Sequence, residues 1–242
     1  MKHAPLILAI LLLPGVAFGQ DISGSGAMSD LNAVGGGIGR NAITLLVAMT
    51  ALSLAPGIAI MVTCFPFIVT VLSILRQSIG LPQSPPNMLI VSLAIFLTWF
   101  VMSPVLTEAW DTAGAPLRDG AITLEQAFDR AIIPFRGFME ARTDPEMLGA
   151  LAEIAPEPDA SPDRLSVLVP AFMLSEIQRA FEIGFLVALP FLIIDLVVSA
   201  VLMSMGMMMV PPTVVALPFK LAFFVVVDGW GMVAAALVRS YQ

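Results

Sequence analysis

Apolar residues fill the chain from residue 42 onward in long runs separated by short turns. The run Ala42–Leu75 carries no charge and as one helix would be ~50 Å long, against ~30 Å for the hydrocarbon core of a bilayer. Pro56-Gly57 and Pro66 interrupt this run, so the pattern predicts a kinked or broken helix. After a turn rich in proline, Met88–Leu106 forms a second apolar run. We therefore predict a first helical hairpin over residues 42–107.

A second pair of apolar runs lies between Ile183 and Trp230, where only Asp195, Lys220 and Asp228 are ionisable. Each run is long enough to cross the hydrocarbon core as a helix of ~20 residues. A short Gly-Met-Met-Met-Val-Pro-Pro connection joins them. The pattern predicts a second helical hairpin over residues 183–242, with a tip rich in methionine: Met203, Met205, Met207, Met208 and Met209.

The two predicted hairpins share a local sequence pattern. Ser78-Ile79-Gly80 precedes Pro85-Pro86 by the same spacing with which Ser204-Met205-Gly206 precedes Pro211-Pro212. We interpret this as two related hairpins whose tips lie on the same side of a membrane.

Between the hairpins lies a polar, acidic segment, residues 108–182, which we expect to be helical and periplasmic. Apart from four aspartates, every acidic residue of the chain falls within it. Residues 121–139 have helical spacing, and Thr123 with Gln126 resembles a capping box. Thr143 or Asp144 is expected to cap a second short helix that begins at Pro145. The apolar stripe predicted for the first helix comprises Leu124, Phe128, Ile132 and Phe135.

Charged residues on that predicted helix alternate in sign, which is typical of a face exposed to solvent. The acids could be interpreted as paired carboxylates for acid–base catalysis, but the interleaved arginines favour a solvated helix face. The acids are Glu125, Asp129 and Glu140, and the arginines are Arg130, Arg136 and Arg142.

The amino-terminal residues resemble a secretory signal peptide, residues 1–19, with a basic start, a short apolar core and a small-residue cleavage pattern. Cleavage between Gly19 and Gln20 would leave a flexible periplasmic segment, residues 20–41, rich in glycine and serine. The first apolar run then crosses inward, which puts Arg76 on the cytoplasmic side and the acidic segment in the periplasm. The alternative for residues 1–19 is a short membrane anchor.

Composition narrows the function further. The chain has 242 residues, 58% of them hydrophobic and 12% charged, a mean hydropathy of +0.95 and a net charge of −7. No basic patch is available for a nucleic acid. Cys64 is the only cysteine and His3 the only histidine, so we expect no disulfide, no metal site, no cofactor and no enzymatic activity.

Charges inside the apolar hairpins need partners, because an isolated charge in the bilayer is costly. Asp195 precedes the methionine-rich tip by about as many residues as Lys220 follows it, so antiparallel helices place the two at similar depth. We predict an ion pair between them, within the subunit or with a neighbour, that fixes register and assembly; a proton relay is the alternative. Glu176, Arg179 and Glu182 lie at positions i, i+3 and i+6, which predicts local helix pairing or polar contacts with an adjacent subunit. A polar contact between subunits is also predicted for Arg76.

Three stretches of the chain resemble the FliP family of the flagellar type III export gate. They are PFLIIDLVVSAVLMSMGMMMVPP and LPFKLAFFVVVDGW in the second hairpin, and LSILRQSIGLPQSPPNMLIVSLAIFLTWFVMSPV in the first. This resemblance implies an all-α integral membrane subunit and a methionine gasket at Met207–Met209. One departure is Phe67, which stands where family members usually carry a basic residue.

The resemblance also implies partners and a place in the cell. A homo-pentameric ring would assemble with FliQ and FliR, work with FlhA and FlhB, and pass unfolded rod, hook and filament proteins. Its place would be the flagellar basal body in the bacterial inner membrane.

Three other functions fit the pattern less well. An injectisome homologue of the same gate generally lacks a signal peptide. A secondary transporter or ion channel would use broken helices and an intramembrane acid such as Asp195. An intramembrane protease would need a catalytic base or a second aspartate, for which the sequence offers no good candidate.

Overall fold

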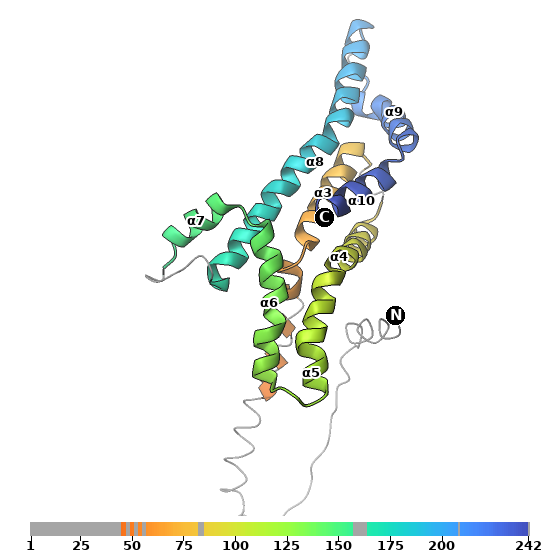
Figure 1. The fold of residues 1–242 in the computed structure, drawn as a ribbon. Helices are drawn as coiled ribbons and strands as arrows, with labels where there is room; N and C mark the ends of the chain where they lie inside the picture. The colour runs from red at the N-terminus through yellow and green to blue at the C-terminus, as the bar shows by residue number, and fades with distance from the viewer. Residues whose placement is uncertain are drawn as a thin grey trace, which may run out of the picture. The chain divides into compact units, whose positions relative to one another are not determined.

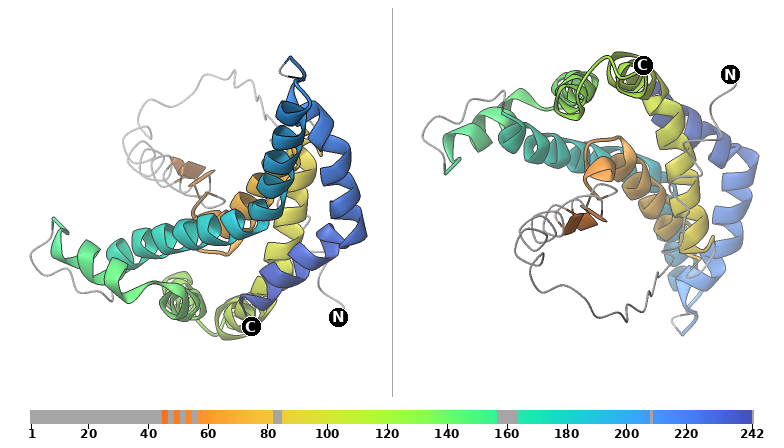
Figure 2. Two further views of the ribbon diagram at one scale, coloured as in Figure 1. Left: turned by 90° about the horizontal axis from the view of Figure 1, so that it is seen from above. Right: turned by 90° about the horizontal axis from the view of Figure 1, so that it is seen from below.

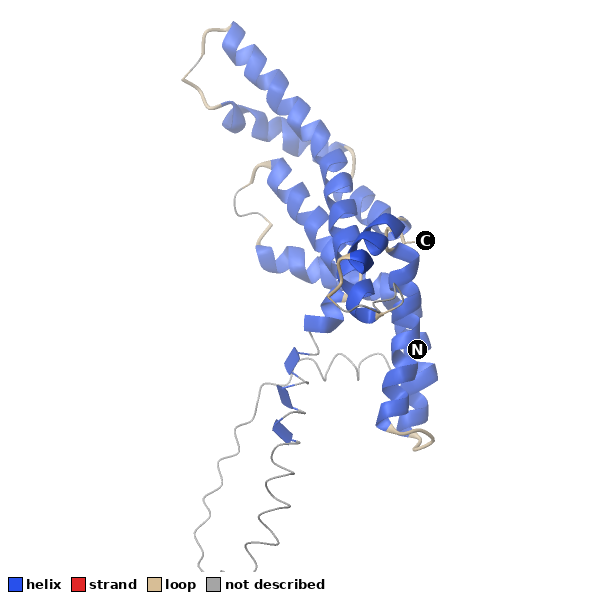
Figure 3. Ribbon diagram, turned by 90° about the vertical axis from the view of Figure 1, so that its left-hand side faces the viewer, coloured by secondary structure: helices blue, strands red, loops and turns tan. Residues whose placement is uncertain are grey.

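The computed structural model describes residues 45–46, 49–50, 53–54, 57–81, 85–156, 164–207 and 209–241. The predicted signal peptide, its cleavage site at Gly19 and Gln20, the amino-terminal segment 20–41 and Met208 lie outside these residues. The described part is helical and contains no strand, which confirms the predicted all-α class (Figure 3). Residues 53–242 form one compact unit, separate from residues 1–52.

The first hairpin begins with the break that its prolines predicted. Helical residues 57–61 end in a turn at residues 62–64, and α3 (Phe65–Ile79) starts there with Pro66 in its first turn. Proline fits this position because the first amides of a helix have no partner within the helix. At the other end, Gly80 has φ +88° and terminates α3. Its amide donates a 3.1 Å hydrogen bond to the Gln77 carbonyl.

The return arm of the first hairpin is longer than predicted. Helix α4 (Asn87–Ala109) continues through a π-helical turn (Trp110–Gly114) into α5 (Ala115–Arg118), giving 32 residues without interruption. The predicted boundary between residues 107 and 108 falls inside this helix. Within the π turn, the ring of Trp110 occupies the place that a side chain at Gly114 would need, so only glycine fits there.

Two helices lie between α5 and α8 in the polar segment, and both begin where predicted. Helix α6 (Leu124–Arg142) begins with the Thr123–Gln126 capping box, and α7 (Pro145–Glu153) begins with the Asp144 carboxylate accepting from the Glu146 amide. Both caps are confirmed. The predicted apolar stripe of α6 is not its packed face throughout, since Leu124 and Phe128 are exposed.

Helix α8 (Leu165–Ser204) contains 40 residues and runs along much of the compact unit (Figure 1). The boundary predicted between residues 182 and 183 lies in the interior of α8. Glu176, Arg179 and Glu182 precede the apolar run that begins at Ile183, and the helix carries them without a break. Helix α3 packs closely along α8, where Ile74 fills the space that a side chain at Gly184 would occupy.

The second hairpin is completed by α9 (Pro212–Val226) and α10 (Gly229–Arg239), which are bent by 61° relative to each other. Asp228 at the bend has φ +50°, and Gly229 allows the ring of Phe224 to lie against its backbone. Views from above and below show α9 beside the far end of α8 and α10 turning back toward α4 (Figure 2).

Within the described residues, α8 and the continuous helix Asn87–Arg118 are long and apolar enough to cross a membrane, and α9 with α10 would make a third span if the bent pair counts as one. The core is centred on the buried face of α3, including Phe67, Val71 and Leu75, and extends to Phe191, Phe224 and Leu237. Phe67, the departure from the family pattern, is therefore a core residue.

Candidate functional site

The methionine-rich tip lies between α8 and α9. Gly206, with φ +75°, ends α8: its amide bonds to the Met203 carbonyl at 3.1 Å, and the Met207 amide bonds to the Leu202 carbonyl at 3.0 Å. These two bonds are those of a Schellman motif, which fixes the backbone where the chain leaves the helix. The tip is thus defined at its α8 end by backbone hydrogen bonds.

The side chains at the tip point away from the packed interior. The exposed fractions are 62% for Met203, 66% for Met205, 41% for Met207 and 98% for Met209. Beneath the tip, α8 and α9 form an apolar groove of about 590 Å³ that Met205 and Met207 help to line. Four flexible apolar side chains therefore lie at one end of the hairpin without a full set of neighbours.

Asp195 and Lys220 form the predicted ion pair, with Lys220 Nζ 2.6 Å from Asp195 Oδ2. The ammonium also donates a 3.0 Å hydrogen bond to the Ser78 carbonyl of the first hairpin. The lysine side chain is 7% exposed and the aspartate side chain 32% exposed. The sequence predicted the pair, because the residues are equidistant from the tip, but not the contact with Ser78.

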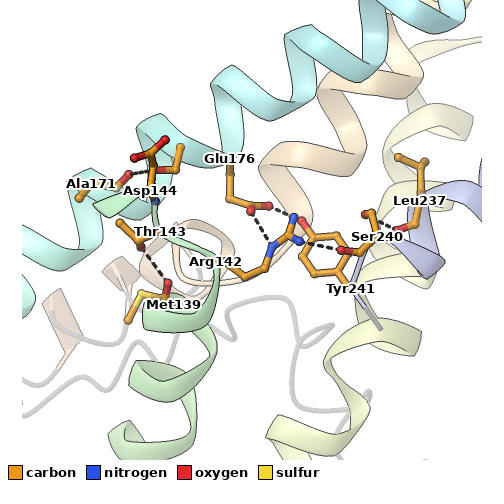
Figure 4. Close-up of polar contacts among 10 residues, drawn as sticks. Met139, Arg142, Thr143, Asp144, Ala171, Glu176, Leu237, Ser240 and Tyr241 are labelled. Carbon is orange, nitrogen blue, oxygen red and sulfur yellow. Dashed lines mark hydrogen bonds and ion pairs between the residues drawn. The ribbon is translucent and has the colours of Figure 1, made fainter. Parts of the chain in front are cut away.

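A second charged centre lies between α6, α8 and the residues after α10 (Figure 4). Arg142 Nε is 3.1 Å from Glu176 Oε1, and Arg142 Nη1 donates to the Ser240 carbonyl at 2.6 Å. The Tyr241 hydroxyl donates to Glu176 Oε2, and the guanidinium lies 4.1 Å from the centre of the Tyr241 ring. Glu176 is completely buried. We refer to Arg142, Glu176 and Tyr241 as the buried triad.

Aromatic packing holds the tyrosine of the triad. Its ring is edge-on to Phe67, with centroids 5.4 Å apart, and stacks on Phe138 at 6.0 Å. Burial and the neighbouring Glu176 carboxylate raise the pKa of the Tyr241 hydroxyl above its usual value. The hydroxyl therefore stays protonated at neutral pH and remains a donor to Glu176.

The triad corrects two sequence-based predictions. Arg142 does not belong to a solvated face, because its side chain is only 14% exposed and pairs with Glu176. The contacts of Glu176 are within its own chain instead of with a neighbouring subunit. Tyr241 was missed altogether; as the only tyrosine in the chain it offered no pattern that linked it to residues 65 and 99 positions earlier.

The other predicted polar residues lie apart from the triad. Glu182 accepts from Gln178 on an exposed face of α8, at 3.3 Å. Arg76 donates to Asn87 and to the Pro85 carbonyl, so its observed contacts cross the turn of its own hairpin. Contacts of Arg179 and Glu182 with another subunit stay predictions.

Reactive or metal-binding groups are few in the described part of the chain. No three His, Cys, Asp or Glu side chains there gather closely enough to hold a metal ion. Cys64 is a free cysteine, completely buried at the start of α3. Its thiol therefore behaves as a small apolar side chain.

Comparisons with known proteins cover nearly the whole chain. The model of the FliP family matches residues 48–237. The flagellar biosynthetic protein FliP of Caulobacter vibrioides is 47% identical over 238 residues, which is 97% of this chain and 88% of the relative. The protein of the same name from Agrobacterium fabrum is 46% identical over 243 residues, 98% of this chain and 97% of the relative. That from Bacillus subtilis is 45% identical over 202 residues, 82% and 91% respectively. The family match extends over both hairpins, the methionine-rich tip and the Asp195–Lys220 pair, and the chain belongs to the FliP family.

Proposed function

We propose that this protein is a core subunit of the flagellar type III export gate and forms an oligomeric pore for unfolded flagellar proteins in the bacterial inner membrane. Membership of the FliP family, and relatives named flagellar biosynthetic proteins, support the flagellar branch. Two helices long and apolar enough to cross a membrane support a membrane location. The single observation that carries the gating role is the exposed methionine-rich tip.

Methionine suits a seal that must adapt to its contents. Its side chain is unbranched and polarizable, so several of them can close an apolar constriction and then repack around a passing chain. An apolar constriction also excludes water and ions at rest. At the tip, Met203, Met205, Met207 and Met209 are exposed in the single subunit, and copies arranged in a ring would bring them together.

The exposed surface of the second hairpin supports assembly with other subunits. Large apolar side chains of α8 and α9 are more than half exposed, an unusual state for a protein surface in water. They include Phe181, Phe185, Leu196, Val225 and Val226. We propose that copies of this chain in a homo-pentamer, together with FliQ, FliR, FlhA and FlhB, cover this surface, while rod, hook and filament proteins pass through the ring.

The proposed role is conduction and gating without covalent chemistry. The acidic helices α6 and α7 would then be periplasmic, and the energy for export would come from partner proteins or the membrane potential. No nucleic acid or cofactor takes part.

Replacement of the exposed tip methionines tests the proposal. In cells carrying the complete export apparatus, M205A/M207A/M209A should raise ion leakage across the inner membrane and reduce motility, while the assembled complex remains at its normal level. Leucine at the same three positions should preserve the apolar seal but slow export, because a branched side chain repacks less freely. The measurements are conductance, swimming and the amount of purified complex.

Met232→Ala is the matched control, because Met232 is 56% exposed but lies on α10, away from the tip. It should leave conductance unchanged. Normal conductance in the triple alanine variant, with a complex that no longer assembles, would make the tip a packing element and refute the seal.

A further inference from the structure

Lys220 contacts both hairpins at once. Its ammonium lies 2.6 Å from Asp195 Oδ2 on α8 and 3.0 Å from the Ser78 carbonyl oxygen on α3. Its nitrogen is also 3.8 Å from the place that a side-chain carbon at Gly80 would take. Lys220 therefore reaches from α9, across the second hairpin, to the turn of the first.

The Ser78 carbonyl needs a donor from elsewhere in the molecule. The last four carbonyls of an α-helix have no amide partner within the helix, and Ser78 is the second-last residue of α3. The Gly80 amide is bonded to the Gln77 carbonyl. A cation also interacts favourably with the carboxyl-terminal end of a helix dipole, so Lys220 satisfies the carbonyl and the dipole together.

Asp195 alone does not explain the placement of the lysine. A surface ion pair would leave the ammonium in solvent, yet the Lys220 side chain is 7% exposed while that of Asp195 is 32% exposed. The more deeply buried partner is the one that contacts the first hairpin. Desolvation of the ammonium is compensated by two acceptors, one from each hairpin.

We propose that Lys220 is a positioning residue that caps α3 and ties the turn of the first hairpin to the middle of the second, so that the two hairpins are held in one register. Asp195 orients the ammonium toward Ser78 and balances its charge. This inference rests on the proposed function only where it concerns the gate. If the methionine-rich tip is the seal, the first hairpin sets the position of that tip through Lys220.

Hydrogen exchange of the amides in residues 78–81 reports the cap directly, because the Gly80 amide closes the end of α3. It should be measured on the complete export-gate complex purified in detergent. Lys220→Met removes the donor and the charge at similar side-chain length, and should accelerate exchange of these amides about tenfold. Lys220→Gln keeps an N–H donor without the charge and should accelerate it less, while Lys220→Arg should stay close to wild type.

The exchanged pair D195K/K220D separates the cap from the ion pair. It keeps opposite charges at positions 195 and 220, but the short aspartate side chain at position 220 has no donor and does not reach the Ser78 carbonyl, so we expect fast exchange at residues 78–81 despite an intact pair. Slow, wild-type exchange in this variant would show that the ion pair is sufficient and overturn the proposal. Unchanged exchange in Lys220→Met would overturn it as well.

Ion leakage in the same variants tells the two proposals apart. Faster exchange with raised leakage supports both the cap and its control of the seal. Faster exchange with normal leakage supports the cap but contradicts the role of the tip as a seal that the first hairpin positions.

Discussion

The protein contains two charged centres, and each compensates a buried charge with different partners. In the buried triad, a carboxylate with no exposed surface is surrounded by a guanidinium and a phenol hydroxyl, both from segments distant in sequence. In the Asp195–Lys220 pair, the cation is the buried member and the carboxylate is one-third exposed. The Glu176 charge is therefore compensated only by its partners in the triad. The Asp195 carboxylate, by contrast, remains accessible to groups outside the chain.

The difference lies in how each charge is compensated when one partner is lost. Removal of one member of a fully buried pair leaves an uncompensated charge, which costs about 3–5 kcal/mol. A charge near the surface keeps part of its hydration, and its pairing energy is about 0–1 kcal/mol. We expect the triad to determine the stability of the subunit and the pair to determine how the hairpins are positioned.

The largest effect is expected for Arg142→Met, which leaves Glu176 charged and completely buried. We expect a loss of about 3–5 kcal/mol, seen as a strongly lowered melting temperature of the purified protein and a low level in the membrane. The double variant R142M/E176Q should recover part of the loss, because no buried charge remains unpaired.

Arg136→Met is the control on the same helix, since the Arg136 side chain is 40% exposed and its contact with Glu140 is a surface one. It should change stability by no more than about 1 kcal/mol. Equal effects of R142M and R136M would erase the contrast between a buried and a surface arginine.

A smaller effect is expected for Tyr241→Phe. The phenylalanine ring keeps the contacts with Phe67 and Phe138 but leaves Glu176 Oε2 without its donor, and hydrogen bonds to charged groups contribute about 1.5–3 kcal/mol. Comparison of the melting temperatures of Tyr241→Phe and Tyr241→Ala separates the contribution of the hydroxyl from that of the ring. If the Tyr241→Phe variant is as stable as the wild type, the hydroxyl contributes nothing and the triad reduces to the Arg142–Glu176 pair.

The smallest effect is expected for Asp195→Asn, which keeps an oxygen for Lys220 and leaves the Ser78 hydrogen bond in place. We expect a loss of about 1.5 kcal/mol or less in the free energy of unfolding, because the buried Lys220 ammonium loses its counter-charge but keeps two oxygen acceptors. The same thermal measurement checks it. A loss as large as that of Arg142→Met would mean that the two centres are equally buried in the working protein.

Local features of the fold were predictable because their causes are local. Thr123 with Gln126, Asp144 before Pro145, and Pro66 within the apolar run each act on the nearest turn of helix, and each appears where expected. The shared pattern of the two turns also has a local cause, since Gly80 and Gly206 both take positive φ at the end of a helix.

The Asp195–Lys220 pair was predictable for a related reason. A short connection forces the arms of a hairpin to run antiparallel, so residues equally distant from the tip lie at the same level. Only the arithmetic of the helix rise was needed.

The buried triad was not predictable, because its members come from three segments that tertiary packing alone brings together. Arg142 follows the same alternation of charge as the exposed arginines of α6, and nothing in its neighbours distinguishes it. The continuity of α8 was missed because the predicted boundary followed Glu182, the last acid of the polar segment, although charge does not prevent a helix from continuing.

That continuity gives α8 a mechanical property. Glu176 is anchored in the triad, and Ser204 at the end of the helix is 28 positions further on, or ~42 Å at the rise of an α-helix. A rigid rod of this length that rotates by ~5° about its anchor displaces its far end by ~4 Å, about the width of a methionine side chain. Pro190 is the one proline on that stretch, and its missing amide makes it the point where such a lever would flex. A small rotation at the anchored end would then move the tip by a distance comparable to one side chain.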